Sequence, residues 1–122
     1  MILVDTSVWV DHLRRGDAKL AQLLDAGQVL AHPFVTGELA LGALRQREAI
    51  LSALVDLPHA TVATDDDVLA FVTSNALYGV GVSWVDVHLL AAVRLTSDAS
   101  LWTRDKWLLK AAGRMNLNAD LP

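Results

Sequence analysis

Short apolar runs recur along the chain, and longer stretches with apolar residues at helical spacing separate them. Runs of three or four residues rich in Val, Ile and Leu are typical of strands that are buried on both faces. The pattern predicts strands at residues 2–4, 29–31, 61–63 and 100–103, with a fifth, edge strand at 116–118.

The stretches between these runs predict helices, several of which begin at recognisable residues. Thr6 or Ser7 can cap the first helix, Pro33 suits a first helical turn, and Thr64 opens a helix. The expected helices cover residues 6–14, 17–27, 33–45, 48–55, 64–78, 85–95 and 105–112. Strands that alternate with helices indicate an α/β fold with a parallel sheet, and 122 residues indicate a single domain over residues 1–122.

The composition is unusually apolar for a small domain, with 53% hydrophobic residues and a mean hydropathy of +0.37. A buried sheet explains part of this, and a self-association surface or an apolar partner would explain the rest. No apolar run approaches the roughly 18 residues of a membrane span, and the acid at position 5 argues against a signal peptide. We therefore expect a cytoplasmic protein without membrane contact. The absence of Cys excludes disulfides and thiolate metal sites.

The net charge of −4 comes from 14 acids and 10 bases, which argues against a protein that coats nucleic acid. Any contact with RNA or DNA must use local groups of Lys and Arg side chains. The alternative explanation for each group is a solvated helix face. The candidate groups are Arg14, Arg15 and Lys19; Arg45 and Arg47; and Arg104, Lys106, Lys110 and Arg114.

Four acids stand at positions where a carboxylate is costly unless a cation satisfies it: Asp5, Glu38, Asp86 and Asp105. Asp5 and Asp105 follow predicted strands, whereas Glu38 and Asp86 lie among apolar neighbours on predicted helices. Since the carboxyl ends of parallel strands form the sites of open α/β sheets, we expect Asp5 and Asp105 at such an edge.

Each acid also has an ordinary structural explanation. Asp5 and Asp105 can cap helices, Asp86 can be a helix-start acid, and Glu38 can pair with Arg45 or another base. If the four converge instead, an oxygen-only ligand set suits Mg²⁺ or Mn²⁺, and phosphodiester hydrolysis is the chemistry that follows. The acidic run at residues 65–67 is explained by helix capping.

Four motifs resemble those of a PIN domain, in order along the whole chain. The segments are Ile2-Leu3-Val4-Asp5-Thr6-Ser7-Val8-Trp9, Thr36-Gly37-Glu38-Leu39-Ala40, Asp86-Val87-His88-Leu89-Leu90-Ala91-Ala92 and Leu101-Trp102-Thr103-Arg104-Asp105-Lys106. The chain looks most like the VapC-type toxins of toxin–antitoxin pairs. The resemblance implies a three-layer α/β/α fold around a short parallel sheet of four to five strands.

The resemblance also implies a Mg²⁺- or Mn²⁺-dependent endoribonuclease that cleaves structured RNA such as tRNA or rRNA. The implied metal-site acids are Asp5, Glu38, Asp86 and Asp105, with Thr6 and Thr103 orienting the site. A homodimer and a small cognate antitoxin are the implied protein partners. Trp107 departs from the family, which often has a basic or smaller residue there. The alternatives are a PIN-like interaction module without nuclease activity and a small Mg²⁺-dependent phosphatase.

Overall fold

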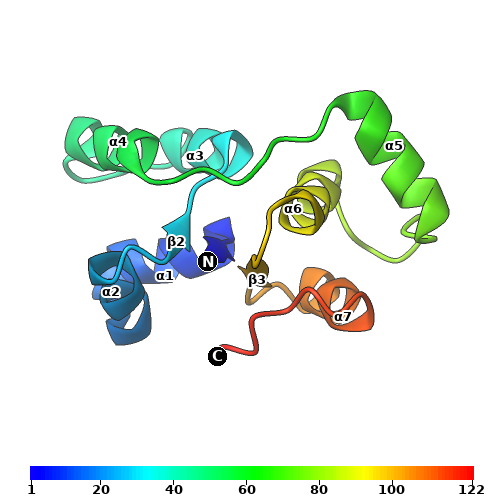
Figure 1. The fold of residues 1–122 in the computed structure, drawn as a ribbon. Helices are drawn as coiled ribbons and strands as arrows, with labels where there is room; N and C mark the ends of the chain where they lie inside the picture. The colour runs from blue at the N-terminus through cyan, green and yellow to red at the C-terminus, as the bar shows by residue number, and fades with distance from the viewer.

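A parallel sheet of three strands lies at the centre of the computed structural model, which covers residues 1–122 (Figure 1). The strands are β1 (Ile2–Val4), β2 (Val29–Leu30) and β3 (Ser100–Trp102), in the order β2-β1-β3. Leu3 of β1 pairs with Leu30 on one side and Leu101 on the other. The α/β class and the parallel pairing are therefore confirmed.

Seven helices surround this sheet. Their bounds are α1 (Thr6–Arg15), α2 (Ala18–Asp25), α3 (Pro33–Ala40), α4 (Arg47–Asp56), α5 (Asp65–Ser74), α6 (Trp84–Leu95) and α7 (Lys106–Arg114). Figure 1 shows α1 to α4 on the β2 side of the sheet and α5 to α7 on the β3 side. None of the helices combines the length and the apolar character that crossing a membrane requires.

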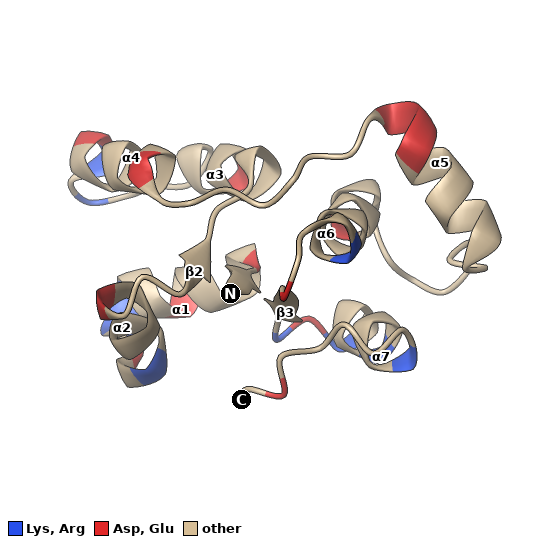
Figure 2. Ribbon diagram, viewed as in Figure 1, with Lys and Arg blue, Asp and Glu red and all other residues tan.

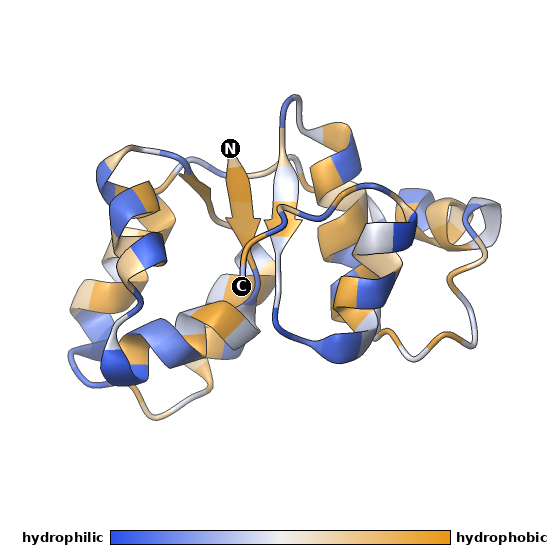
Figure 3. Cartoon of the chain, turned by 90° about the horizontal axis from the view of Figure 1, so that it is seen from below, coloured by the Kyte–Doolittle hydropathy of each residue, from blue (hydrophilic) through white to orange (hydrophobic).

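Burial in the core explains why β1 is an unbroken apolar run in the sequence. Leu3, Val4, Leu101 and Trp102 have no exposed surface, and seven consecutive residues of α6, 87–93, are buried. The strand that begins near the N label is orange throughout in Figure 3. A strand buried on both faces cannot alternate with polar residues, so its sequence is apolar at every position.

The prediction of four to five strands is wrong at residues 61–63. The chain pairs with the β2 edge only at a single bridge, between Ala31 and His59. It then leaves the sheet, because the Thr61 amide donates to the Thr96 hydroxyl at the end of α6, at 2.9 Å, rather than to a strand. Ala63 is buried although it pairs with no strand, so an apolar residue at this position did not indicate a strand.

The fifth strand, expected at 116–118, is also reduced to one bridge, between Leu101 and Asn118. Asn116 has a φ of +58°, so the chain turns sharply out of α7 just before it reaches β3. Two helices end earlier than predicted: α3 ends at Ala40 instead of residue 45, and α5 ends at Ser74 instead of residue 78. Thr64 caps α5 through the Asp67 amide, which confirms the capping explanation for the acidic run.

Candidate active site

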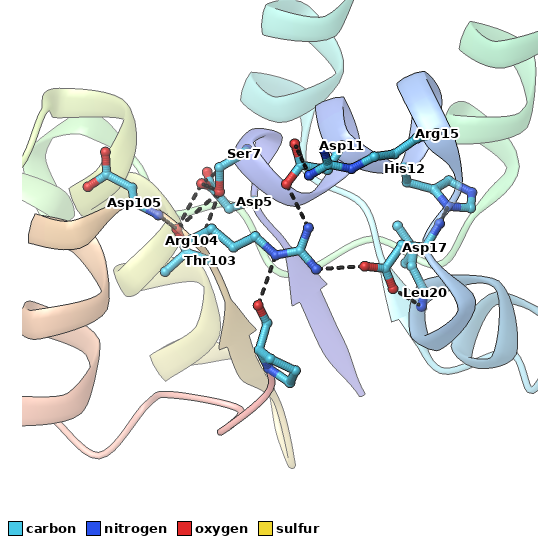
Figure 4. A network of polar contacts seen from close by, with 11 residues as sticks. Asp5, Ser7, Asp11, His12, Arg15, Asp17, Leu20, Thr103, Arg104 and Asp105 are labelled. Atoms are coloured by element: carbon cyan, nitrogen blue, oxygen red, sulfur yellow. Dashed lines mark hydrogen bonds and ion pairs between the residues drawn. The ribbon is translucent and has the colours of Figure 1, made fainter.

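Asp5 is the most enclosed of the four acids, with 6% of its surface exposed. It follows β1 and caps α1, where its Oδ2 accepts hydrogen bonds from the Ser7 amide at 3.3 Å and the Ser7 hydroxyl at 2.7 Å. The Thr103 hydroxyl donates to the same oxygen at 2.9 Å. Figure 4 shows Ser7 and Thr103 beside this carboxylate. The ends of β1 and β3 are thereby joined at one oxygen atom.

Thr103 connects Asp5 to the next acid. Its hydroxyl, in a side chain only 2% exposed, also accepts from the Asp105 amide at 3.0 Å. Asp105 caps α7 by accepting from two amides of the first turn at Oδ1, at 3.1 and 2.9 Å. Its other oxygen is left for further partners, and Figure 4 shows this carboxylate turned away from Asp5.

Asp86 lies in the first turn of α6 and forms a capping box with Ser83. Its Oδ2 accepts from the Ser83 amide at 3.0 Å, and its own amide donates to the Ser83 hydroxyl at 3.1 Å. Burial raises the pKa of Asp86, and the negative charges of Asp5 and Asp105 raise it further. Asp86 is therefore affected by the charges of two acids from two other segments of the chain.

Glu38 is exposed, and its link to the other acids is indirect, through Thr6, the residue after Asp5. The Thr6 hydroxyl donates to Glu38 Oε1 at 2.7 Å. The expected alternative, an ion pair with Arg45, is absent, because none of the four ion pairs in the structure includes Glu38.

An aromatic contact sets the spacing between the helices that carry Glu38 and Asp86. Phe34, one turn before Glu38 on α3, packs on His88 of α6 with ring centroids 4.6 Å apart. His88 also contacts Trp84 at 4.7 Å, and Phe34 contacts His32 at 5.3 Å. The tilted contact between Phe34 and His88 links α3 to α6, the two helices that carry Glu38 and Asp86.

The structural explanations for three acids are also confirmed, since Asp5, Asp86 and Asp105 all cap helices. A cap uses one carboxylate oxygen and leaves lone pairs for other partners, so capping and metal binding are compatible. As the side chains stand, no three acids or histidines are close enough to hold a metal ion. The donor set still fits a hard cation, because it offers only carboxylate and hydroxyl oxygens around acids that repel one another.

Sequence reasoning missed two residues of this network, Ser7 and Arg104. The Arg104 amide donates to the Ser7 hydroxyl at 3.0 Å, and its guanidinium donates to Asp11 at 2.7 Å and to Asp17 at 2.6 Å (Figure 4). The hydrogen bond from Arg104 lowers the pKa of Asp17, and the two carboxylates raise the pKa of Arg104. Arg104 is thus a structural cation and not a free base. A polar residue two positions after a strand-end Asp was the signal for Ser7.

Comparison with known proteins places this chain in a family. The PIN-domain family model matches residues 2–114, which include all four acids. The chain is also 50% identical over 112 residues to Ribonuclease VapC32 of Mycobacterium tuberculosis, in strains CDC 1551 / Oshkosh and ATCC 25618 / H37Rv. The match covers 92% of this chain and 90% of each relative.

This chain belongs to the VapC-type ribonucleases of the PIN-domain family. The resemblance inferred from four short motifs is therefore confirmed at the level of the family. The match spans β1 through α7, so it includes both strand ends and every helix that contributes an acid to the network.

Proposed function

We propose that this VapC-type protein is an endoribonuclease that hydrolyses phosphodiester bonds in structured RNA, such as tRNA or rRNA, at Asp5, Glu38, Asp86 and Asp105. One observation carries the proposal: burial and the charges of Asp5 and Asp105 together raise the pKa of Asp86. A partly buried carboxylate close to other negative charges gains from a bound divalent cation.

Asp5, Asp86 and Asp105 would hold Mg²⁺ or Mn²⁺, with Glu38 as a further ligand or as the base that orients water. When bound, such an ion lowers the pKa of a water molecule and offsets the charge of the departing oxygen. Ser7 and Thr103 hold Asp5 Oδ2 in place, since both hydroxyls donate to it. The bond from Thr6 fixes Glu38 Oε1 and leaves Oε2 to accept a proton from the attacking water.

The protein partners proposed here are a cognate antitoxin and a second copy of the chain, in the cytoplasm. Several large apolar side chains are more than one third exposed, including Leu41 at 90%, Tyr78 at 69% and Val55 at 64%. Exposed apolar surface of this kind supports protein contacts.

The function is tested with purified protein, free of any partner, and total RNA in Mg²⁺ or Mn²⁺. Asp86→Asn should abolish cleavage, whereas Asp56→Asn, which removes an exposed acid at the end of α4, should leave it intact. Discrete fragments that disappear with EDTA and with Asp86→Asn would support the nuclease.

Absence of cleavage with every metal would favour the interaction module. Hydrolysis of a generic phosphate monoester without RNA cleavage would favour the phosphatase.

A further inference from the structure

A pocket of about 680 Å³ lies beside α7, and the proposed chemistry does not use it. One wall is the loop before α6, and the other is one face of α7; the lining residues are Gly79, Val80, Gly81, Trp107, Lys110, Ala111 and Arg114. The volume lies within the range of sites that hold small ligands, about 300–1,000 Å³. The lining includes two cations and no acid, so the pocket favours an anionic ligand.

The cations of this pocket belong to a basic stripe on α7, formed by Lys106, Lys110 and Arg114. Because these residues are four apart, they lie along one side of the helix (blue on α7 in Figure 2). None of the three forms an ion pair with an acid, unlike Arg104. The stripe begins directly after Asp105 and extends over about 12 Å of helix axis. Positive charge therefore leads away from the acidic site.

Trp107 lies within this stripe and is 45% exposed. The Lys106 and Lys110 ammonium groups lie 4.7 and 6.0 Å from its ring centroid. An exposed aromatic ring between cations is the combination that holds single-stranded nucleic acids, because bases stack on the ring and phosphates meet the cations. Double-stranded RNA does not present a free base face to such a ring.

The pocket is preformed by its loop. Gly81 has a φ of +87°, and a Cβ there would lie 3.1 Å from the Trp107 ring, so the loop backbone packs directly on the indole. At the start of the same segment, Arg114 Nη2 donates to the Asn75 carbonyl at 2.7 Å. Both contacts hold the loop against α7, and little ordering would be required on binding.

We infer that this pocket is a subsite for an unpaired nucleotide of the RNA, adjacent to the phosphodiester that the acids engage. The inference rests on the proposed function and deepens it. The base stacks on the exposed part of Trp107, and the adjoining phosphates meet Lys110 and Arg114. The subsite selects RNA that is unpaired beside the cut, with little preference for the identity of the base.

Binding without catalysis tests the subsite. A fluorescein-labelled RNA of six nucleotides that cannot pair with itself is titrated in EDTA at several salt concentrations, with anisotropy as the readout. Trp107→Leu should weaken binding about 5- to 100-fold, because it removes stacking. Lys110→Gln should reduce the slope of log K against log salt by about 0.7. Arg94→Gln, which removes an exposed cation in the last turn of α6 outside the candidate basic groups, is the matched control and should change neither value.

Unchanged affinity in Trp107→Leu, or an unchanged salt slope in Lys110→Gln, would overturn the subsite. Lys110→Gln decides the question alone if circular dichroism shows that Trp107→Leu is unfolded. If the wild type binds this RNA through Trp107 yet cleaves no RNA in Mg²⁺ or Mn²⁺, the subsite stands and the nuclease fails. If the wild type cleaves RNA and Trp107→Leu binds the six-nucleotide RNA with unchanged affinity, only the subsite is refuted.

Discussion

Replacing Thr103 by Val removes one hydroxyl while keeping the shape of a fully enclosed side chain. That hydroxyl donates to Asp5 Oδ2 at 2.9 Å and accepts from the Asp105 amide at 3.0 Å. A hydrogen bond to a charged group contributes about 1.5–3 kcal/mol, and an amide left without its partner costs about 1–3 kcal/mol. Asp5 keeps its bonds from Ser7, so we expect a total loss of about 2–4 kcal/mol.

Urea unfolding in EDTA measures this loss. With an m-value of about 1–3 kcal/mol per molar urea, the midpoint should fall by about 1 M or more. Thr103→Ser retains the hydroxyl and should recover most of the stability. Thr73→Val is the matched control, since Thr73 is exposed and donates only to a carbonyl of its own helix.

The hydroxyl of Thr103 should also matter for activity. Because Thr103 holds Asp5, Thr103→Val should lose most RNA cleavage at temperatures where it is folded, and Thr103→Ser should keep it. A Thr103→Val midpoint equal to that of Thr73→Val would refute the structural account of the bond. Full cleavage by a destabilised Thr103→Val would refute its role in positioning Asp5.

Three further changes have clear signs. Asp86→Asn should raise the urea midpoint at pH 7 without divalent ions, because a raised pKa means that ionised Asp86 destabilises the fold above that pKa; a lower midpoint would contradict this. Arg104→Met should cost about 1–3 kcal/mol by removing the ion pairs with Asp11 and Asp17, and should lower the Tm. An unchanged Tm would show that these ion pairs do not stabilise the fold. Burial, with nearby histidines, lowers the pKa of His32 from 6.5 to about 4, so stability should fall as pH drops through that window, and less in His32→Asn, whose amide can still cap α3.

The candidate acids could be selected from the sequence, whereas the number of strands could not be predicted from it. Asp5 and Asp105 follow strands that the pattern located, and acids on apolar helix faces are rare enough to stand out. Some helix starts were also predictable, because Thr64 and Pro33 act within a few residues of their own position. The first helix is capped by Asp5 and not by Thr6 or Ser7, which lie inside it.

Long-range partners could not be predicted in the same way. Thr61 was expected in a strand, yet its amide bonds to Thr96, 35 residues away, and nothing near Thr61 encodes that choice. The pairing of Arg104 with Asp11 and Asp17 likewise depends on how α1 and α2 pack, so this base was grouped with free cations. Trp107 was noted as a departure from the family, but only the placement of Gly81 shows that its ring forms a pocket wall.

The two single bridges that replaced the predicted outer strands bear on solubility. A three-stranded sheet has two outer edges, and an open edge recruits strands from other molecules into aggregates. Here the Ala60 amide donates to Ala31 at one edge, and the Leu101 amide donates to Leu117 at the other. Each bridge places a segment of the chain itself over an outer edge of the sheet. A strand from another molecule cannot pair with backbone groups that this segment already binds. Detachment of either segment would thus expose an edge strand and promote aggregation of this small apolar domain.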